Sequence, residues 1–239
     1  MFSVIVPTFN RPGLLLRALR SLRLQLYPDW EAVVVDDGDG AGLRAAQELG
    51  EPRVVAVRSQ GKGQVAARNT GLLHARGEYI ALLDDDDWWQ DPTHLYRVAR
   101  ALRAQEGLVY RGGYLVYERD GLELERIPFD HRATPEALRK DNLILASGVA
   151  YPRRLHDELG PFDPEMDDYW DWDWYLRVVG AGYPLLGLPG RGVVVSVHGG
   201  NMSYAARLEE RKRNLERLCA KHGLVGVELK DHRIIAGAA

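Results

Sequence analysis

Four consecutive carboxylates, Asp84–Asp87, are the strongest chemical signal in this 239-residue chain. Adjacent carboxylates repel one another, and protonation or a bound cation relieves the repulsion. A hard divalent ion such as Mg²⁺ or Mn²⁺ suits the run, especially where diphosphate oxygens share the coordination. A solvated acidic turn is the plainer interpretation, but the run ends an apolar strand pattern and precedes Trp88 and Trp89. We favour a metal site, and exclude an EF-hand loop because the tryptophans stand where a further ligand and the turn glycine belong.

A second acidic pair, Asp36 and Asp37, ends another apolar run and precedes Gly38. A carboxylate at a strand end can accept a hydrogen bond from a uracil or guanine N–H, or from ribose hydroxyls. It can equally cap the helix that follows. The pair alone is therefore a weak signal, and both interpretations stay open.

Two cations, Lys62 and Arg68, lie around a glycine-rich turn that opens a helix pattern. An arginine beside a diphosphate supplies charge and a fork of donors. Lys62 could do similar work, or could simply lie on an exposed helix face. A phosphate-loop ATPase is excluded, because the turn lacks the upstream glycine and the following serine or threonine. A dinucleotide fingerprint is excluded too, since Pro7-Thr8-Phe9-Asn10 follows the first strand pattern.

Residues 167–175 alternate carboxylates with tryptophan and tyrosine. Aromatic faces beside carboxylates suit a sugar, which offers C–H faces and hydroxyl rims. Asp171 and Asp173 also fall in the first turn of a predicted helix, where acidic residues compensate the helix dipole. For Asp171 the two roles are compatible, whereas we expect Trp172 to pack in the core.

A histidine, His198, directly follows the strand pattern Val193–Val197 and precedes two glycines. Such a residue can contact phosphate or metal, although a lone histidine is more often structural.

Alternating strand and helix patterns must position these residues in the first half of the chain. Strands are predicted at 4–6, 33–35, 54–57 and 79–83, and helices at 14–26, 41–49, 63–73 and 92–105. This order predicts a mostly parallel sheet with helices on both faces. Ligands bind such sheets outside the carboxyl ends of the strands, where both acidic clusters are expected.

The second half is less regular. We predict a hairpin from 108–117 and 122–127, a short helix within 128–150, a helix from about 170 to 180, a strand at 193–197, and a charged helix at 204–222. The predicted organisation is a donor-binding half at 1–105, an acceptor-side and catalytic half of the same domain at 106–203, and a C-terminal helix and tail at 204–239.

The composition excludes several classes of protein. An apolar fraction of 46% and a charged fraction of 27% are those of a globular protein rather than a disordered one. The formal net charge of −3 disfavours a nucleic-acid binder. One cysteine, Cys219, permits no disulfide within the chain, and scattered histidines disfavour a zinc site. No leader pattern and no bilayer-length apolar run is found, so we expect a cytoplasmic protein that could touch a membrane surface.

Taken in order, these motifs resemble those of family 2 glycosyltransferases with the GT-A fold. The resemblance covers nearly the whole chain, most clearly residues 3–92 and 160–203. The matching segments are 4–11, 35–38, 67–71, 77–87, 160–163 and 171–173. Each segment is weak alone, and their order and spacing make the match specific. The implied fold class is α/β, a Rossmann-like, mostly parallel sheet with a mixed acceptor-side half.

The resemblance implies a site for a nucleoside-diphosphate sugar, with uridine diphosphate as the favoured nucleotide. Asp37 would hold the base, Arg68 would approach the diphosphate, and Asp86 would be the direct ligand of Mg²⁺ or Mn²⁺. His198 would contact the metal or the diphosphate. The implied donor-binding residues are Pro7, Thr8, Asn10, Arg11, Asp37, Lys62, Arg68, Asp84 and Asp85.

On the acceptor side, Asp171 aligns with the aspartate of the family's Glu-Asp catalytic pair, which implies a general base. Trp170 stands where the family usually has glutamate, and Asp168 is a candidate to supply that charge. We therefore assign Asp168, Trp170 and Trp172 to the acceptor side. Gly160-Pro161 also departs from the glycine pair that the family has before Phe162.

The predicted reaction is transfer of a sugar to an acceptor hydroxyl with inversion, in polysaccharide, glycolipid or cell-envelope glycan synthesis. The acceptor is expected to be a sugar or a lipid-linked compound. A sugar-phosphate nucleotidyltransferase is disfavoured by the loop after the first strand, which is not Gly-rich. A non-catalytic nucleotide-sugar-binding relative is disfavoured by Asp86, Arg68 and Asp171. The basic terminal helix could pair subunits in a homodimer or rest on anionic lipid, but a solvated helix is favoured.

Overall fold

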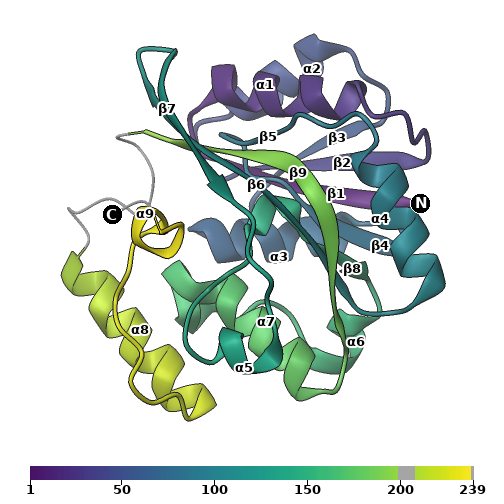
Figure 1. The fold of residues 1–239 in the computed structure, drawn as a ribbon. Helices are drawn as coiled ribbons and strands as arrows, with labels where there is room; N and C mark the ends of the chain where they lie inside the picture. The colour runs from purple at the N-terminus through teal and green to yellow at the C-terminus, as the bar shows by residue number, and fades with distance from the viewer. Residues whose placement is uncertain (199–207, 238–239) are drawn as a thin grey trace.

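A computed structural model describes residues 1–198 and 208–237 (Figure 1). The strands are β1 (Phe2–Thr8), β2 (Trp30–Asp36), β3 (Val54–Arg58), β4 (Tyr79–Leu82), β5 (Trp88–Trp89), β6 (Leu108–Arg119), β7 (Leu122–Phe129), β8 (Ala150–Pro152) and β9 (Leu185–Val197). The two glycines that follow His198, and the predicted start of the terminal helix at 204, lie outside the described residues.

The α-helices are α1 (Pro12–Arg23), α2 (Ala41–Leu49), α3 (Gln64–His74), α4 (His94–Ala104), α5 (Pro135–Leu138), α6 (Leu155–Leu159), α7 (Trp170–Gly180), α8 (Leu208–His222) and α9 (His232–Ile235). Two 3₁₀ helices, η1 (Ala146–Gly148) and η2 (Pro164–Tyr169), interrupt the second half. Within the described residues, no helix is both long and apolar enough to cross a bilayer.

The first half of the sheet is parallel, as predicted, with strand order β3-β2-β1-β4. Alternate residues of β1 face opposite sides, because side chains of a strand have a period of two. Val4 and Val6 join the core beneath α1, α2 and α4, whereas Ile5 joins the core that includes α3 and α7. Helices therefore cover both faces, and Figure 1 shows α1 and α2 on one side of the sheet with α3 and α7 on the other.

The second half adds antiparallel strands to the same sheet. β8 pairs antiparallel with β4 and with β6, while β6 pairs parallel with β9. The predicted hairpin is β6–β7, and it turns at Asp120 and Gly121, both of which have positive φ. One sheet thus runs through both predicted halves, and their division into donor and acceptor functions stays a prediction.

Several boundaries differ from those predicted. β9 begins at Leu185, eight positions before the expected Val193, because its first residues pair with β6 from Leu108 onward. β5 is only Trp88–Trp89, and it forms by pairing with Val193 and Val194 of β9. Neither segment has a local pattern strong enough to predict it.

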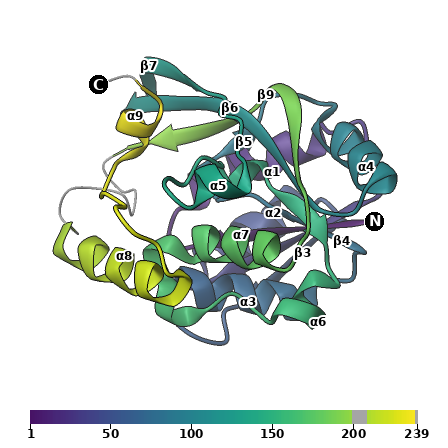
Figure 2. The ribbon, with the colours of Figure 1, turned by 60° about the horizontal axis from the view of Figure 1, so that its bottom comes forward.

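The terminal helix α8 packs one face against the rest of the protein. Asn214, Leu215 and Leu218 are buried, and the helix packs against η2, the segment that leads into α7. Figure 2 shows α8 beside this part of the molecule. Whether the opposite, charged face pairs subunits or meets lipid stays a prediction.

Candidate active site

A cavity of about 1110 Å³ opens at the carboxyl ends of the parallel strands. This volume lies just above the roughly 300–1,000 Å³ that is usual for small-molecule sites. Among its lining residues are Pro7, Thr8, Asn10, Arg11, Asp37, Lys62, Arg68, Asp84, Asp85, Asp86, Asp168, Trp170, Asp171 and Trp172. The fold therefore brings the predicted donor-side and acceptor-side residues to one cavity.

The acidic run meets the loop that follows β1, because β1 and β4 are parallel neighbours in the sheet. Thr8 donates its hydroxyl to Asp85, with 2.6 Å between Oγ1 and Oδ2. Arg11 pairs with both Asp85, at 2.6 Å, and Asp86, at 2.7 Å. His198, at the end of β9, lies 3.2 Å from Asp86 through Nε2. Three loops thus meet around one pair of carboxylates.

The neighbouring carboxylates hold protons to different degrees. Burial raises the pKa of Asp85 to about 7, although the charge of Arg11 opposes the rise. Burial acts on the pKa of Asp86 in the same direction, but the hydrogen bond from His198 and the charge of Arg11 outweigh it and lower that pKa. Of these two, Asp86 is therefore the carboxylate that is better held in its charged form.

Asp84, Asp86 and Asp87 each offer an oxygen, and these oxygens lie within 4.8 Å of one another. Such hard oxygen donors fit Mg²⁺ or Mn²⁺. Asp87 also has a structural role, since its carboxylate accepts from the hydroxyl of Ser147 and, at 3.0 Å, from the backbone N–H of Ser196. That leaves Asp84 and Asp86 as the better placed of the three for a metal.

Asp36 and Asp37, at the end of β2, have different contacts, and these separate the two interpretations that the sequence left open, helix capping and ligand binding. Asp36 accepts from the backbone N–H groups of Gly38, at 2.7 Å, and Leu43, at 3.1 Å, so it ties β2 to the first turn of α2. Asp37 lines the cavity and accepts from the backbone N–H of Gly63 at 2.7 Å. The cap is Asp36, and Asp37 is the one placed to contact a ligand.

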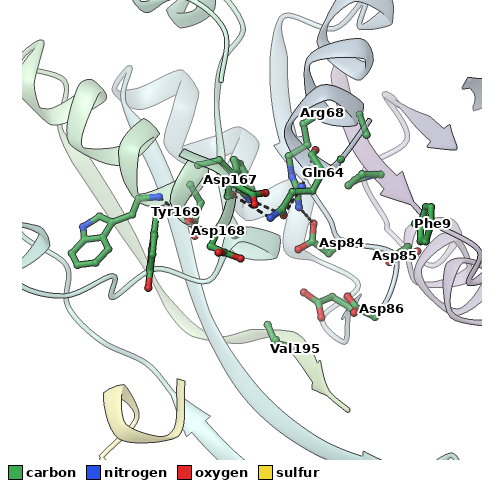
Figure 3. Close-up of a pocket in the computed structure, with 18 of the residues that line it drawn as sticks. Phe9, Gln64, Arg68, Asp84, Asp85, Asp86, Asp167, Asp168, Tyr169 and Val195 are labelled. Carbon is green, nitrogen blue, oxygen red and sulfur yellow. Dashed lines mark hydrogen bonds and ion pairs between the residues drawn. The ribbon is translucent and has the colours of Figure 1, made fainter. Parts of the chain in front are cut away.

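Arg68 lies on α3 and is almost completely buried, with 3% of its surface exposed. It forms an ion pair with Asp84. Its Nη1 donates to the backbone and the side-chain oxygens of Gln64, each at 3.1 Å. Figure 3 shows Gln64 and Arg68 together, with Asp84 beside them. The predicted diphosphate residue is thus held rigidly at the edge of the acidic run.

Asp171 lies in the first turn of α7, on the same cavity. One carboxylate oxygen, Oδ2, accepts from Asn142 Nδ2 at 2.8 Å, and the other accepts from the backbone N–H of Trp172 at 2.8 Å. Burial raises the pKa of Asp171 to about 6, and the hydrogen bond from Asn142 opposes the rise. A carboxylate with this pKa is poised to accept a proton near neutral pH.

The other predicted acceptor-side residues differ in their surroundings. Trp172 belongs to the core, as expected, and its indole N–H donates to the backbone carbonyl of Leu138 at 2.6 Å. Asp168 accepts from Asn214 of α8 at 2.9 Å. Trp170 contacts Arg68, a donor-side residue, and so lies between the two predicted groups. On the donor side, the predicted residue Lys62 lines the cavity, and its side chain is exposed.

Three cavity residues were missed by the sequence reasoning. Phe9 is 58% exposed and lines the same cavity as the predicted base-binding residue Asp37. An aromatic residue in the loop after the first strand was a signal that could have found it. Gln64 and Asn142 carry no such signal, because their roles depend on contacts with Asp167 and Asp171 from distant parts of the chain.

Residues 3–156 match the family described as "Glycosyl transferase family 2". The chain belongs to glycosyltransferase family 2. This glycosyltransferase is 32% identical over 240 residues to the uncharacterized glycosyltransferase YwdF of Bacillus subtilis strain 168, covering 98% of this chain and 88% of the relative. It is 28% identical to the putative colanic acid biosynthesis glycosyl transferase WcaA of Escherichia coli K12, over 75% of this chain and 66% of the relative. A nucleotidyltransferase is not favoured.

Solved structures confirm the predicted GT-A class. Residues 1–349 of Staphylococcus aureus TarS, solved with UDP-GlcNAc, superpose with a TM-score of 0.70 at 19% identity, covering 99% of this chain and 71% of that one. The mannosyltransferase PcManGT of Pyrobaculum calidifontis, solved with GDP-Man and Mn²⁺, superposes with a TM-score of 0.69 at 23% identity, covering 99% and 68%. At these identities the likeness establishes the fold alone.

Proposed function

We propose that this glycosyltransferase moves a sugar from a nucleoside diphosphate, with uridine diphosphate favoured, to an acceptor hydroxyl with inversion. The observation that carries the proposal is one cavity lined by Arg68 and the acidic run together with Asp171. The nucleotide sugars bound in the TarS and PcManGT structures support the donor class. The colanic acid relative, and a putative teichuronic acid biosynthesis glycosyltransferase, TuaG of Bacillus subtilis, support a role in cell-envelope glycans.

Asp84 and Asp86 would hold Mg²⁺ or Mn²⁺, whose charge when bound would stabilise the negative charge that develops on the leaving diphosphate. Arg68 would add a second positive charge at the same place. Asp37 and the exposed ring of Phe9 would bind the nucleotide base. His198, through Asp86, would keep the metal-binding carboxylate charged and oriented.

Asp171 would accept the proton of the acceptor hydroxyl. A bond forms between the acceptor oxygen and the anomeric carbon while the bond from that carbon to the diphosphate oxygen breaks. The nucleoside diphosphate leaves with the electron pair, and the proton moves to Asp171. Asn142 would orient the general base Asp171, because its amide N–H holds one oxygen of the Asp171 carboxylate in place.

The direct test is a calorimetric panel of UDP-, GDP- and dTDP-sugars, each with and without Mn²⁺ or Mg²⁺. We expect metal-dependent binding of one nucleotide. In a second experiment, the protein should transfer the sugar to a sugar or lipid-linked acceptor, and NMR of the product should show an inverted anomeric configuration. Folded protein that binds none of these compounds would contradict the proposal. Binding without transfer or donor hydrolysis would favour a non-catalytic relative.

A further inference from the structure

Arg68 is a buried cation that must keep its position when a donor or a metal binds and changes the charge around it. A buried guanidinium requires partners, because desolvation without compensation is costly. Its anionic partner in this structure is Asp84, which the proposed function also assigns to the metal and donor. The neutral contacts of Arg68 are therefore the ones that can persist when a donor binds.

Those neutral contacts converge on Trp170. The guanidinium carbon of Arg68 lies 3.9 Å from the ring centroid of Trp170, the geometry of a cation–π contact. The indole Nε1 of Trp170 donates to Gln64 Oε1 at 3.1 Å, and the same oxygen accepts from Arg68. Trp170 thus supports Arg68 both directly and through a shared hydrogen-bond acceptor.

The support is itself held firmly. Gln64 Nε2 donates to the backbone carbonyl of Asp167 at 3.1 Å, so the orientation of its amide is determined by three hydrogen bonds. Asp167 has φ 33°, an uncommon value for a residue other than glycine, at the kink before α7. Phe162 packs edge-on against Trp170, with 4.9 Å between ring centroids. Gln64 and Arg68 of α3, together with Phe162, hold the indole in one orientation.

The position of Trp170 also explains why an aromatic residue can stand where the resemblance leads one to expect glutamate. A carboxylate at position 170 would pair with Arg68 and neutralise part of its charge. The face of an indole attracts a cation through its quadrupole and leaves the net charge of the cation unchanged. Arg68 can therefore present its positive charge to a diphosphate.

We propose that Trp170 is a positioning residue that holds Arg68 toward the donor diphosphate through a neutral aromatic face. The inference rests on the proposed function, in which Arg68 contacts the diphosphate. It moves Trp170 from the acceptor side, where the sequence placed it, to the donor side.

The matched variants are Trp170→Leu and Trp174→Leu. Both tryptophans are buried in the same core cluster, one turn apart on α7, but Trp174 contacts Arg177 rather than Arg68, and its indole N–H is unpaired among the described residues. Trp170→Phe is the conservative variant, since it keeps a ring and loses the N–H. Two properties are measured: the Kd of UDP and GDP with Mn²⁺ by calorimetry, and the rate at which phenylglyoxal modifies Arg68 without nucleotide, mapped by peptide mass spectrometry.

We expect Trp170→Leu to weaken nucleotide binding about tenfold, from loss of a desolvated cation–π contact and a hydrogen bond. Arg68 should then react faster with phenylglyoxal. Trp170→Phe should recover most of the affinity and remain about threefold weaker than wild type, because tryptophan is the better cation–π partner. Trp174→Leu should lower Tm but change neither property.

A folded Trp170→Leu variant with wild-type Kd and wild-type Arg68 reactivity would overturn the inference, as would equal effects in Trp174→Leu. If Trp170→Leu does not fold, Trp170→Phe decides by the same two measurements. A wild-type protein that binds neither nucleotide overturns the proposed function instead. The phenylglyoxal rates would still decide whether Trp170 positions Arg68.

Discussion

The cavity contains two kinds of acidic site, and they are built in opposite ways. The Asp84–Asp87 run is flanked by the cations Arg11 and Arg68, which pair with its carboxylates, and by the imidazole of His198. Asp171 instead accepts hydrogen bonds from neutral donors, the amide of Asn142 and a backbone N–H. The pKa of Asp86 is accordingly lowered, whereas burial raises that of Asp171 to about 6.

This difference shows how one cavity can use the same residue type for two purposes. A carboxylate such as Asp86, whose hydrogen bond to His198 and ion pair with Arg11 outweigh its burial, keeps its charge and suits a metal or an ordered ion network. A half-buried carboxylate with neutral partners releases and accepts a proton near neutral pH, which suits a general base. Each prediction below would break or sharpen this contrast.

The largest effect is expected from Asp171→Asn. The variant keeps the shape of the site but cannot accept a proton, so transfer should fall by about 10²–10⁴. The Kd of the nucleoside diphosphate, measured by calorimetry, should stay at the wild-type value because Asp171 lies outside the acidic run. Transfer at the wild-type rate would remove Asp171 from the mechanism.

The next largest effect is expected from Asp86→Asn. Charge stabilisation by a bound metal is worth several kcal/mol, so losing it should lower the transfer rate by at least about 10². Chelation with EDTA should weaken nucleotide binding to the wild type but make little further difference to the variant. Asp130→Asn, at an exposed carboxylate paired with Arg191, is the control. A variant that still binds Mn²⁺ like the wild type would contradict the assignment.

A smaller, pH-dependent effect is expected from Asn142→Leu. The amide donates to the charged form of Asp171 and so lowers its pKa; removing the donor raises it. A hydrogen bond to a charged group is worth about 1.5–3 kcal/mol, or about one to two pH units. The acid limb of the kcat profile, near pH 6 in the wild type, should move upward by that amount. The same loss of activity at every pH would instead indicate a purely structural role.

The smallest effect is expected from Asp36→Ala. This carboxylate caps the entry to α2, so its loss should cost about 1 kcal/mol of stability. Tm should fall by about 2–4 °C in a protein of this size. Nucleotide affinity should stay unchanged, whereas Asp37→Ala should weaken it. Equal loss of affinity in both variants would show that the roles of the two neighbours are not separate.

The amino-acid sequence by itself determined much of the donor half. Short apolar runs such as Val33–Val35, each followed by a helical pattern, are local signals, and their alternation predicts a parallel sheet whose strand ends share one edge. Because that edge gathers whatever follows each strand, the Asp36–Asp37 pair and the acidic run could be predicted to meet before any contact was known, and the family resemblance added Thr8 to them. Arg68 could be placed near them for the same reason, since its helix follows the next strand.

The tertiary structure alone decided the partners of these residues. Asn142 meets Asp171 across 29 positions of sequence, and Gln64 meets Asp167 across 103, so no local pattern reports either contact. β5 and the first part of β9 form only because a neighbouring strand completes their hydrogen bonds. The candidate carboxylates, the acidic run and Asp171, could be identified from the sequence, but the charge of each depends on its burial and on which donors lie nearby. Folding determines both, and with them the difference between the proposed metal ligand and the proposed base.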